Sequence, residues 1–169
     1  MATDKTKSNF PLTVAEDGWS TEEEATATCF CGAVQLSFPT QGPGLINTFV
    51  CNCADCRKVT ASMFASNFTV DDKYLKHLRG QEKNLSSWGQ AKTVSSGNKM
   101  TNFFCSTCGT LMYRVSSGYP GTSILRIGTV DDFSLAEDKL KPQTECFIER
   151  RVGWLSRVEG ARHVEGFDP

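Results

Sequence analysis

The sequence predicts a mainly β fold, a single domain of short strands with metal sites at loop ends. Apolar residues recur at every second position, as at Val34, Leu36 and Phe38, which is the period of a half-buried strand. Turns rich in glycine and proline, such as Gly118-Tyr119-Pro120-Gly121, separate the apolar runs. Seven of the eight cysteines lie in three tight clusters next to such runs.

Each expected strand is a run of four to eight residues that is apolar or alternating and is bounded by turn residues. In chain order these runs cover residues 34–38, 45–50, 64–70, 92–95, 100–105, 110–115, 124–129 and 146–152. Helix is scarce, and we expect only one turn after Cys56 and another around residues 131–135. Residues 1–24 are polar and predict a flexible N-terminal arm. We expect a metal-binding domain over residues 25–160 and a C-terminal tail over residues 161–169.

Composition excludes several classes of function. The 169 residues carry 18 basic and 19 acidic side chains, a formal net charge of −1, so no nucleic-acid footprint is present. No stretch approaches the roughly 18 apolar residues of a membrane span. The chain opens with Met1-Ala2-Thr3-Asp4-Lys5-Thr6-Lys7, which lacks the apolar segment of a secretory signal. We therefore expect a cytoplasmic protein, a monomer or homodimer, with a small-molecule substrate and neither nucleic-acid nor membrane partners.

The cysteine clusters have the sizes that two zinc sites require. The two pairs and the triplet are Cys29 and Cys31; Cys105 and Cys108; and Cys51, Cys53 and Cys56. A closed structural zinc site needs four ligands, whereas a catalytic site uses three and keeps one position open. The simplest assignment is a structural Zn²⁺ on the two pairs and a reactive Zn²⁺ on the triplet, two ions per chain.

Three alternatives compete with this assignment. Eight cysteines could form four disulfides, but cysteines one residue apart fit the bridge geometry badly. Cys105-Ser106-Thr107-Cys108 could be a redox pair, but such pairs open a helix, and an apolar strand-like run follows Gly109. Cys146 could close the triplet as a fourth ligand, although a lone cysteine in an apolar run is more often a small buried residue.

The triplet favours thiol chemistry over hydrolysis. Three thiolates on Zn²⁺ leave a net charge of −1, and such an ion is a poor acid for bound water but holds an exchangeable thiolate well. Arg57 and Lys58 follow the last ligand of the triplet, so they could offset thiolate charge or bind a carboxylate of an incoming cofactor. The alternative for this pair is a solvated surface turn.

The ordered motifs resemble those of the glutathione-dependent formaldehyde-activating enzyme family, which includes centromere protein V. The segments that carry the resemblance are Cys29-Phe30-Cys31-Gly32, Cys51-Asn52-Cys53-Ala54-Asp55-Cys56-Arg57, Phe104-Cys105-Ser106-Thr107-Cys108-Gly109-Thr110, Gly128-Thr129-Val130-Asp131, Arg151 and Trp154. The resemblance implies a β-rich fold of short antiparallel sheets, similar to the small zinc-bearing Rab exchange factors. It also implies a structural zinc on the two cysteine pairs and a labile catalytic zinc on the triplet.

The reaction that names the family joins glutathione to formaldehyde, giving S-hydroxymethylglutathione, and is classed with the carbon–sulfur lyases. The resemblance thus implies a zinc enzyme that binds a thiol such as glutathione as thiolate at the triplet, where it attacks a small electrophile. A related step of specialised metabolism on another substrate is equally consistent with the motifs. The alternative from another class is a non-catalytic, zinc-folded binding module whose triplet is closed by Cys146.

Overall fold

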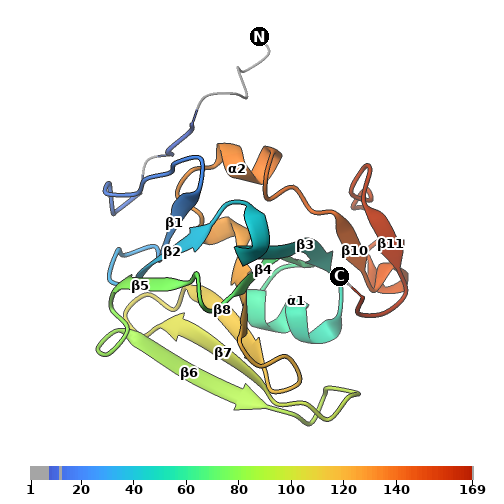
Figure 1. Cartoon of the computed structure of the whole chain (residues 1–169). Coiled ribbons are helices and arrows are strands. Elements are labelled where there is room, and N and C mark those ends of the chain that lie inside the picture. Colours follow the sequence, from blue (N-terminus) through green and yellow to red (C-terminus); the bar gives the residue numbers. More distant parts are fainter. Residues whose placement is uncertain (1–7, 12, 169) are drawn as a thin grey trace.

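The computed structural model describes residues 8–11 and 13–168, which form two β-sheets packed face to face (Figure 1). The mainly β prediction is confirmed, and the family's short antiparallel sheets are present. Among the described residues, none of the helices has the length and apolar character needed to span a bilayer.

The smaller sheet contains three antiparallel strands in the order β1-β2-β5. Its members are β1 (Glu24–Thr28), β2 (Gln35–Pro39) and β5 (Lys76–Arg79). All five residues of β2 are buried, because the strand is central in its sheet and is covered by the larger one.

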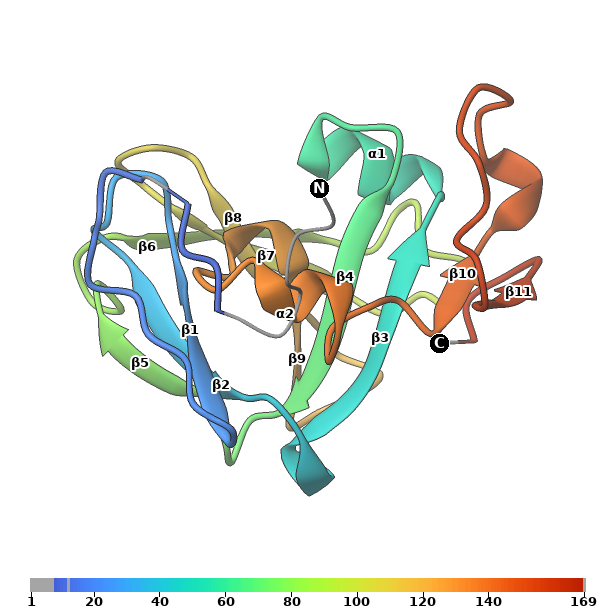
Figure 2. The same cartoon turned by 90° about the horizontal axis from the view of Figure 1, so that it is seen from above.

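The larger sheet contains eight strands in the order β11-β10-β3-β4-β9-β8-β7-β6. The strands are β3 (Leu45–Cys51), β4 (Ala65–Asp71), β6 (Leu85–Gln90), β7 (Met100–Cys105), β8 (Leu111–Ser116), β9 (Thr122–Arg126), β10 (Thr144–Cys146) and β11 (Arg162–Val164). Neighbouring strands of this sheet pair antiparallel except at one edge, where β10 runs parallel to both β3 and β11. Figure 2 shows the small sheet on one side of β4, with β10 and β11 on the other.

The helices are short. They are α1 (Ala54–Thr60) and α2 (Ser134–Glu137), with the 3-10 turns η1 (Gly42–Gly44), η2 (Ile127–Thr129) and η3 (Ile148–Arg150). The two helical turns that the sequence predicts are thus present, but α1 starts inside the cysteine triplet rather than after it.

The main hydrophobic core fills the space between the two sheets. Phe38 of β2 contacts Phe68 of β4, with ring centroids 4.7 Å apart, and both side chains are fully buried. Each such side chain contributes roughly 1.5–3 kcal/mol by leaving water. Because successive strand residues face opposite sides, Phe68 and Val70 enter this core while Asn67 and Thr69 point to the other face of the large sheet.

Two expected strands are wrong, and a third, at 124–129, ends at Arg126, immediately before η2 begins. Residues 92–95 form turns between β6 and β7, and the strand lies instead at Leu85–Gln90, whose Ser- and Gly-containing sequence lacks an apolar pattern because it is an edge strand. The strand expected at 146–152 ends at Cys146, since Phe147 adopts a left-handed conformation (φ 53°) that starts η3.

The described parts of the predicted arm and tail make contacts with the rest of the domain. In the arm, the backbone N–H of Trp19 donates to Thr26 Oγ1 (2.9 Å) and that of Asn9 donates to Asp132 Oδ1 (2.9 Å). In the tail, β11 pairs with β10, which extends the large sheet by one strand. Residues 1–7, also assigned to the arm, lie outside the described residues.

Candidate metal centres

The first candidate site gathers the sulfurs of Cys29, Cys31, Cys105 and Cys108, all within 4.8 Å of one another. The Sγ atom of Cys31 lies 3.7 Å from that of Cys29 and 3.8 Å from that of Cys105. Four sulfurs at about 2.3 Å from a central Zn²⁺ form a tetrahedron with edges of about 3.8 Å, so this spacing fits zinc. All eight cysteines are free thiols in the structure.

Two similar knuckles hold these sulfurs. In one, Gly32 takes a φ of +82° and donates its N–H to Cys29 O; in the other, Gly109 takes +77° and donates to Cys105 O. These positive φ values need glycine, because a side chain would be strained there. Thr110 Oγ1 accepts from Phe30 N at 3.1 Å and so connects the two knuckles.

This site joins the two sheets. One knuckle follows β1 of the small sheet, and the other connects β7 to β8 of the large sheet. Burial raises the pKa of the Cys29 thiol to about 12. Although partial burial raises the pKa of Cys108, hydrogen bonds from Thr110 bring it down to about 6. A metal ion that deprotonates all four sulfurs would therefore couple its binding to the packing of the sheets.

The second candidate site gathers the sulfurs of Cys51, Cys53 and Cys56 within 4.8 Å of one another. Cys51 ends β3, Cys53 is the N-cap of α1, and Cys56 lies in the first turn of that helix. The Cys53 sulfur accepts the backbone N–H of Cys56 at 3.3 Å, a bond that both starts the helix and orients the sulfur. The triplet therefore combines the end of a strand with the start of a helix.

The three sulfurs share negative charge. Hydrogen bonds from Cys51 and Cys56 lower the pKa of Cys53 to about 2, and the same interaction raises the pKa of Cys51. One thiolate and two neighbouring thiols form a set of sulfur donors. A soft divalent metal ion can bind all three sulfurs by displacing the remaining protons. The residues present thus fit a zinc ion.

Cys146 lies beside this site but does not belong to the sulfur cluster. It is the cross-strand partner of Cys51 in the parallel pair of β10 and β3 and is fully buried. Its pKa is raised, chiefly by burial, and its sulfur is near the backbone of Asp168. Among the described residues, only the three triplet cysteines come together within ligand distance here.

Two buried cations that the sequence does not single out lie beside the triplet. Arg57 and Lys58 lie on α1, half-buried and exposed, and the described residues give neither side chain a hydrogen bond or ion pair. Arg114 and Arg126, from β8 and β9, are instead buried beside the sulfurs, each with 6% of its surface exposed. Arg114 Nη1 lies 4.0 Å from Cys56 Sγ, and the charges of all three cysteines act on Arg126.

Strand register explains this arrangement. Asn67 of β4 is the cross-strand partner of Arg126, and Asn102 of β7 is that of Arg114. Each arginine binds its partner: Arg126 Nη1 donates to Asn67 Oδ1, and Arg114 Nε donates to Asn102 Oδ1 at 3.0 Å. The sequence carries one signal for this face, the arginine inside the alternating run 124–129, but pairing with distant strands cannot be read from it.

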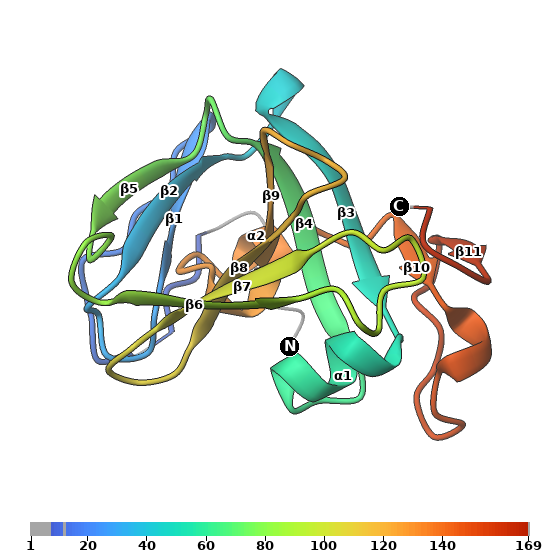
Figure 3. The ribbon, with the colours of Figure 1, turned by 90° about the horizontal axis from the view of Figure 1, so that it is seen from below.

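Helix α1 and the β6–β7 connection flank the same face. Asp55 Oδ2 accepts from Thr93 Oγ1 (2.6 Å) and from Gln90 Nε2 (3.4 Å), which ties the helix to that connection. Figure 3 shows α1 against the ends of β3 and β4, with this connection alongside. The two arginines thus lie beside the triplet, on the face of the large sheet opposite the main core.

A buried carboxylate holds the triplet segment to β10. Asn52, between the first two ligands, donates its side-chain amide to Glu145 Oε1 (3.2 Å) and to Cys146 O (3.1 Å). Arg151 Nη1 donates to Glu145 Oε1 at 3.0 Å, and Val158 N donates to Oε2 at 3.2 Å. Burial raises the pKa of Glu145, but these hydrogen bonds outweigh it and lower the pKa below its ordinary value.

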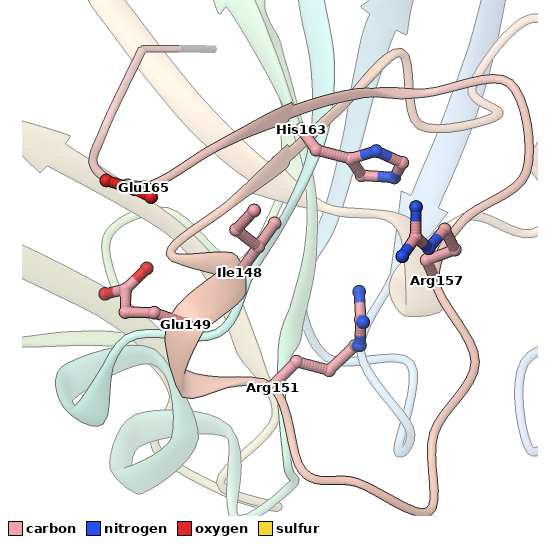
Figure 4. A pocket seen from close by; sticks show the side chains of 6 residues that line it. All are labelled: Ile148, Glu149, Arg151, Arg157, His163 and Glu165. Carbon is pink, nitrogen blue, oxygen red and sulfur yellow. The ribbon is translucent and has the colours of Figure 1, made fainter.

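A pocket of about 270 Å³ opens on the outer side of this carboxylate, lined by Ile148, Glu149, Arg151, Arg157, His163 and Glu165. Figure 4 shows Arg151, Arg157 and His163 gathered on one side, with Glu149 and Glu165 on the other. None of the lining residues is a cysteine. Because Glu145 already pairs with Arg151 and lies 3.4 Å from His163 Nε2, this pocket has a largely balanced charge.

Comparison with known proteins gives one family. The model of the family described as glutathione-dependent formaldehyde-activating enzyme matches residues 24–150, three quarters of the chain and every triplet and pair cysteine. A crystal structure of a Rhodobacter sphaeroides protein matches with 24% identity and a TM-score of 0.46, over 62% of this chain and 85% of that one. The comparison with curated proteins gave no match.

Proposed function

This chain belongs to the family of glutathione-dependent formaldehyde-activating enzymes, and we propose that it is a zinc enzyme acting on a carbon–sulfur bond of a small thiol adduct. The observation that carries the proposal is the incomplete sulfur cluster. Of the described residues, three cysteines and no fourth ligand gather at the end of β3, whereas the other cluster has four. Three protein ligands with one open position are the pattern of a catalytic zinc site.

The chain's own residues have separate roles in this proposal. Cys51, Cys53 and Cys56 would hold the catalytic zinc, and Cys29, Cys31, Cys105 and Cys108 would hold the structural one. When bound, the catalytic ion supplies positive charge that keeps a thiol co-substrate such as glutathione as an exchangeable thiolate. Asn52 and Glu145 fix the segment that carries the first two ligands.

The overall reaction balances without another reactant. A thiol sulfur forms a bond to the carbonyl carbon of a small aldehyde, the carbonyl π pair moves onto oxygen, and the thiol proton ends on that oxygen. The product is a hemithioacetal, which for glutathione and formaldehyde is S-hydroxymethylglutathione. The reverse reaction breaks the same carbon–sulfur bond.

The role of Arg57 and Lys58 stays a prediction. Both lie on α1 immediately after the last triplet ligand, where a carboxylate of a bound thiol peptide could reach them. Changing both to glutamine should weaken binding of glutathione but not of 2-mercaptoethanol, which has no carboxylate. Equal affinity of the double variant and the unchanged protein for glutathione would exclude this role.

The test of the function combines metal content with activity. The zinc-loaded protein should bind about two ions, and mild chelation should remove one while the fold persists, because only the four-sulfur site joins the sheets. Exchange NMR with glutathione and formaldehyde should show adduct formation faster than the uncatalysed rate, and Cys53→Ala should return it to that rate. A panel of other thiols and aldehydes then defines the substrate.

Two results would contradict the proposal. If no thiol or aldehyde in the panel reacts faster with the protein than without it, the enzyme assignment fails. If Cys146→Ala releases the second zinc ion, the triplet is closed by that residue, and the chain is a zinc-folded binding module instead. Cys146 is the specific residue to test because it neighbours Cys51 across the strand pair.

A further inference from the structure

Two arginines are buried against the triplet without a carboxylate to balance them. No described acidic side chain forms an ion pair with Arg114 or Arg126, and Nε and Nη2 of Arg126 are buried with no hydrogen-bond partner among the described residues. The two guanidinium groups come from the paired strands β8 and β9 and carry the same charge, so they also repel one another. Burying like charges together is costly unless anions accompany them.

The triplet supplies the anions. Arg114 Nη1 lies 4.0 Å from Cys56 Sγ, and the charges on the three sulfurs act favourably on Arg126. A guanidinium group stays protonated at neutral pH, so both side chains are positively charged. Both cations therefore belong to the triplet site.

The triplet site with a bound zinc ion lacks one negative charge. Three thiolates and one Zn²⁺ sum to −1, and the two arginines bring the total to +1. A neutral fourth ligand leaves that buried positive charge uncompensated, whereas an anionic ligand cancels it. In a water-poor site this difference is larger than at a surface, because charge interactions are less screened.

We infer that Arg114 and Arg126 make the open position of the triplet selective for a singly charged anion, and for a thiolate over a neutral ligand. The inference rests on the proposed function only for the presence of the metal at the triplet. Its basis is the pair of buried guanidinium groups that the cross-strand partners Asn67 and Asn102 hold in place. The orphaned nitrogens of Arg126 provide donors for such a ligand.

Ligand binding to the cobalt-substituted protein tests the inference without any reaction. Azide and 2-mercaptoethanol serve as anionic ligands, imidazole at pH 8 serves as a neutral one, and the visible spectrum of Co²⁺ reports binding. We expect azide to bind the unchanged protein, and Arg126→Gln or Arg114→Gln to raise its Kd by at least about tenfold. The Kd of imidazole should stay within about twofold in the same variants.

Two controls separate charge from structure. Arg126→Lys keeps the positive charge and should recover most of the azide affinity that Arg126→Gln loses. Arg150→Gln removes a half-exposed arginine that pairs only with its neighbour Glu149 among the described acidic side chains. It should change the Kd of neither azide nor imidazole. If Arg126→Gln does not fold, Arg114→Gln and the ratio of azide to imidazole affinity in the unchanged protein still decide the question.

The outcomes distinguish this inference from the function it accompanies. Equal loss of azide and imidazole affinity in the glutamine variants, or no loss of azide affinity, overturns the inference. If 2-mercaptoethanol binds the unchanged protein and both glutamine variants equally well, the inference fails while thiol chemistry remains. If azide depends on the arginines but no thiol binds, the anion site stands and the proposed thiol chemistry fails.

Discussion

Cys146 lies directly opposite Cys51 in the parallel pairing of β10 with β3, yet only Cys51 joins the three-sulfur cluster. Cross-strand partners carry their side chains on the same face of a sheet. The two thiols are therefore on neighbouring strands, but only the Cys51 sulfur lies within 4.8 Å of both other triplet sulfurs. The number of metal ligands at this site depends on that difference.

Cys146→Ala should keep two zinc ions per chain and should lower the free energy of unfolding by only about 1 kcal/mol, for the loss of one small buried sulfur. Cys53→Ala should keep one zinc ion and the fold. Elemental analysis and thermal melting of the two variants provide the measurement. Loss of zinc from Cys146→Ala would show that the triplet site is closed by a fourth cysteine.

Cys105→Ala should unfold the protein or make it insoluble. Cys105 is fully buried at the end of β7, and its sulfur lies 3.8 Å from that of Cys31 in the knuckle that follows β1. A site with three remaining sulfurs loses much of its metal-binding free energy, which is coupled to the packing of the two sheets. Circular dichroism measures the folding of the variant, and elemental analysis measures its zinc content. An unchanged melting temperature would mean that the two pairs do not share an ion.

Glu145→Gln should destabilise the fold by about 3 kcal/mol, because it leaves Arg151 without its buried partner. The exposed Glu159→Gln is the matched control and should have little effect. Urea unfolding at neutral pH compares the two. Similar unfolding midpoints would show that the Glu145 network contributes little to stability.

The pH dependence of stability should report the same carboxylate. The folded-state pKa of Glu145 lies below its ordinary value of 4.5. The contribution of Glu145 to the free energy of unfolding is therefore fully present above pH 4.5 and is lost as the pH falls through the lowered pKa of the folded state. Acid unfolding should be less steep in Glu145→Gln than in the unchanged protein, and curves of equal slope would contradict this.

Asn52→Ala should lower the free energy of unfolding by about 2 kcal/mol, since it removes two buried hydrogen bonds to β10. It should also speed release of the triplet zinc to a chelator, because Asn52 fixes the segment between Cys51 and Cys53. Asn52→Asp should destabilise the fold more than Asn52→Ala does, because it places a second carboxylate against Glu145. Chelation rates equal to those of the unchanged protein in both variants would remove Asn52 from the support of this site.

The sequence by itself determined which cysteines cluster and most of the central strands. Cysteine spacing predicted the triplet and the two pairs, because ligands a few residues apart reach one ion whatever the rest of the chain does. The four ligands of a closed zinc site predicted that the two pairs share one cluster. Alternation of apolar residues predicted most of the strands, including 45–50, 100–105 and 110–115, since a half-buried strand needs that period. The strands that were missed, β1, β5, β6 and β11, are the edge strands of the two sheets, where an apolar pattern is needed least.

Only the tertiary structure decided what surrounds the triplet. Arg57 and Lys58 are the nearest cations in sequence, but Arg114 and Arg126 are the buried cations beside the sulfurs. They reach this place through antiparallel pairing of β4 with β9 and of β7 with β8. Local sequence cannot encode such a juxtaposition, because hydrogen bonding and register between strands far apart in the chain bring these side chains to one face.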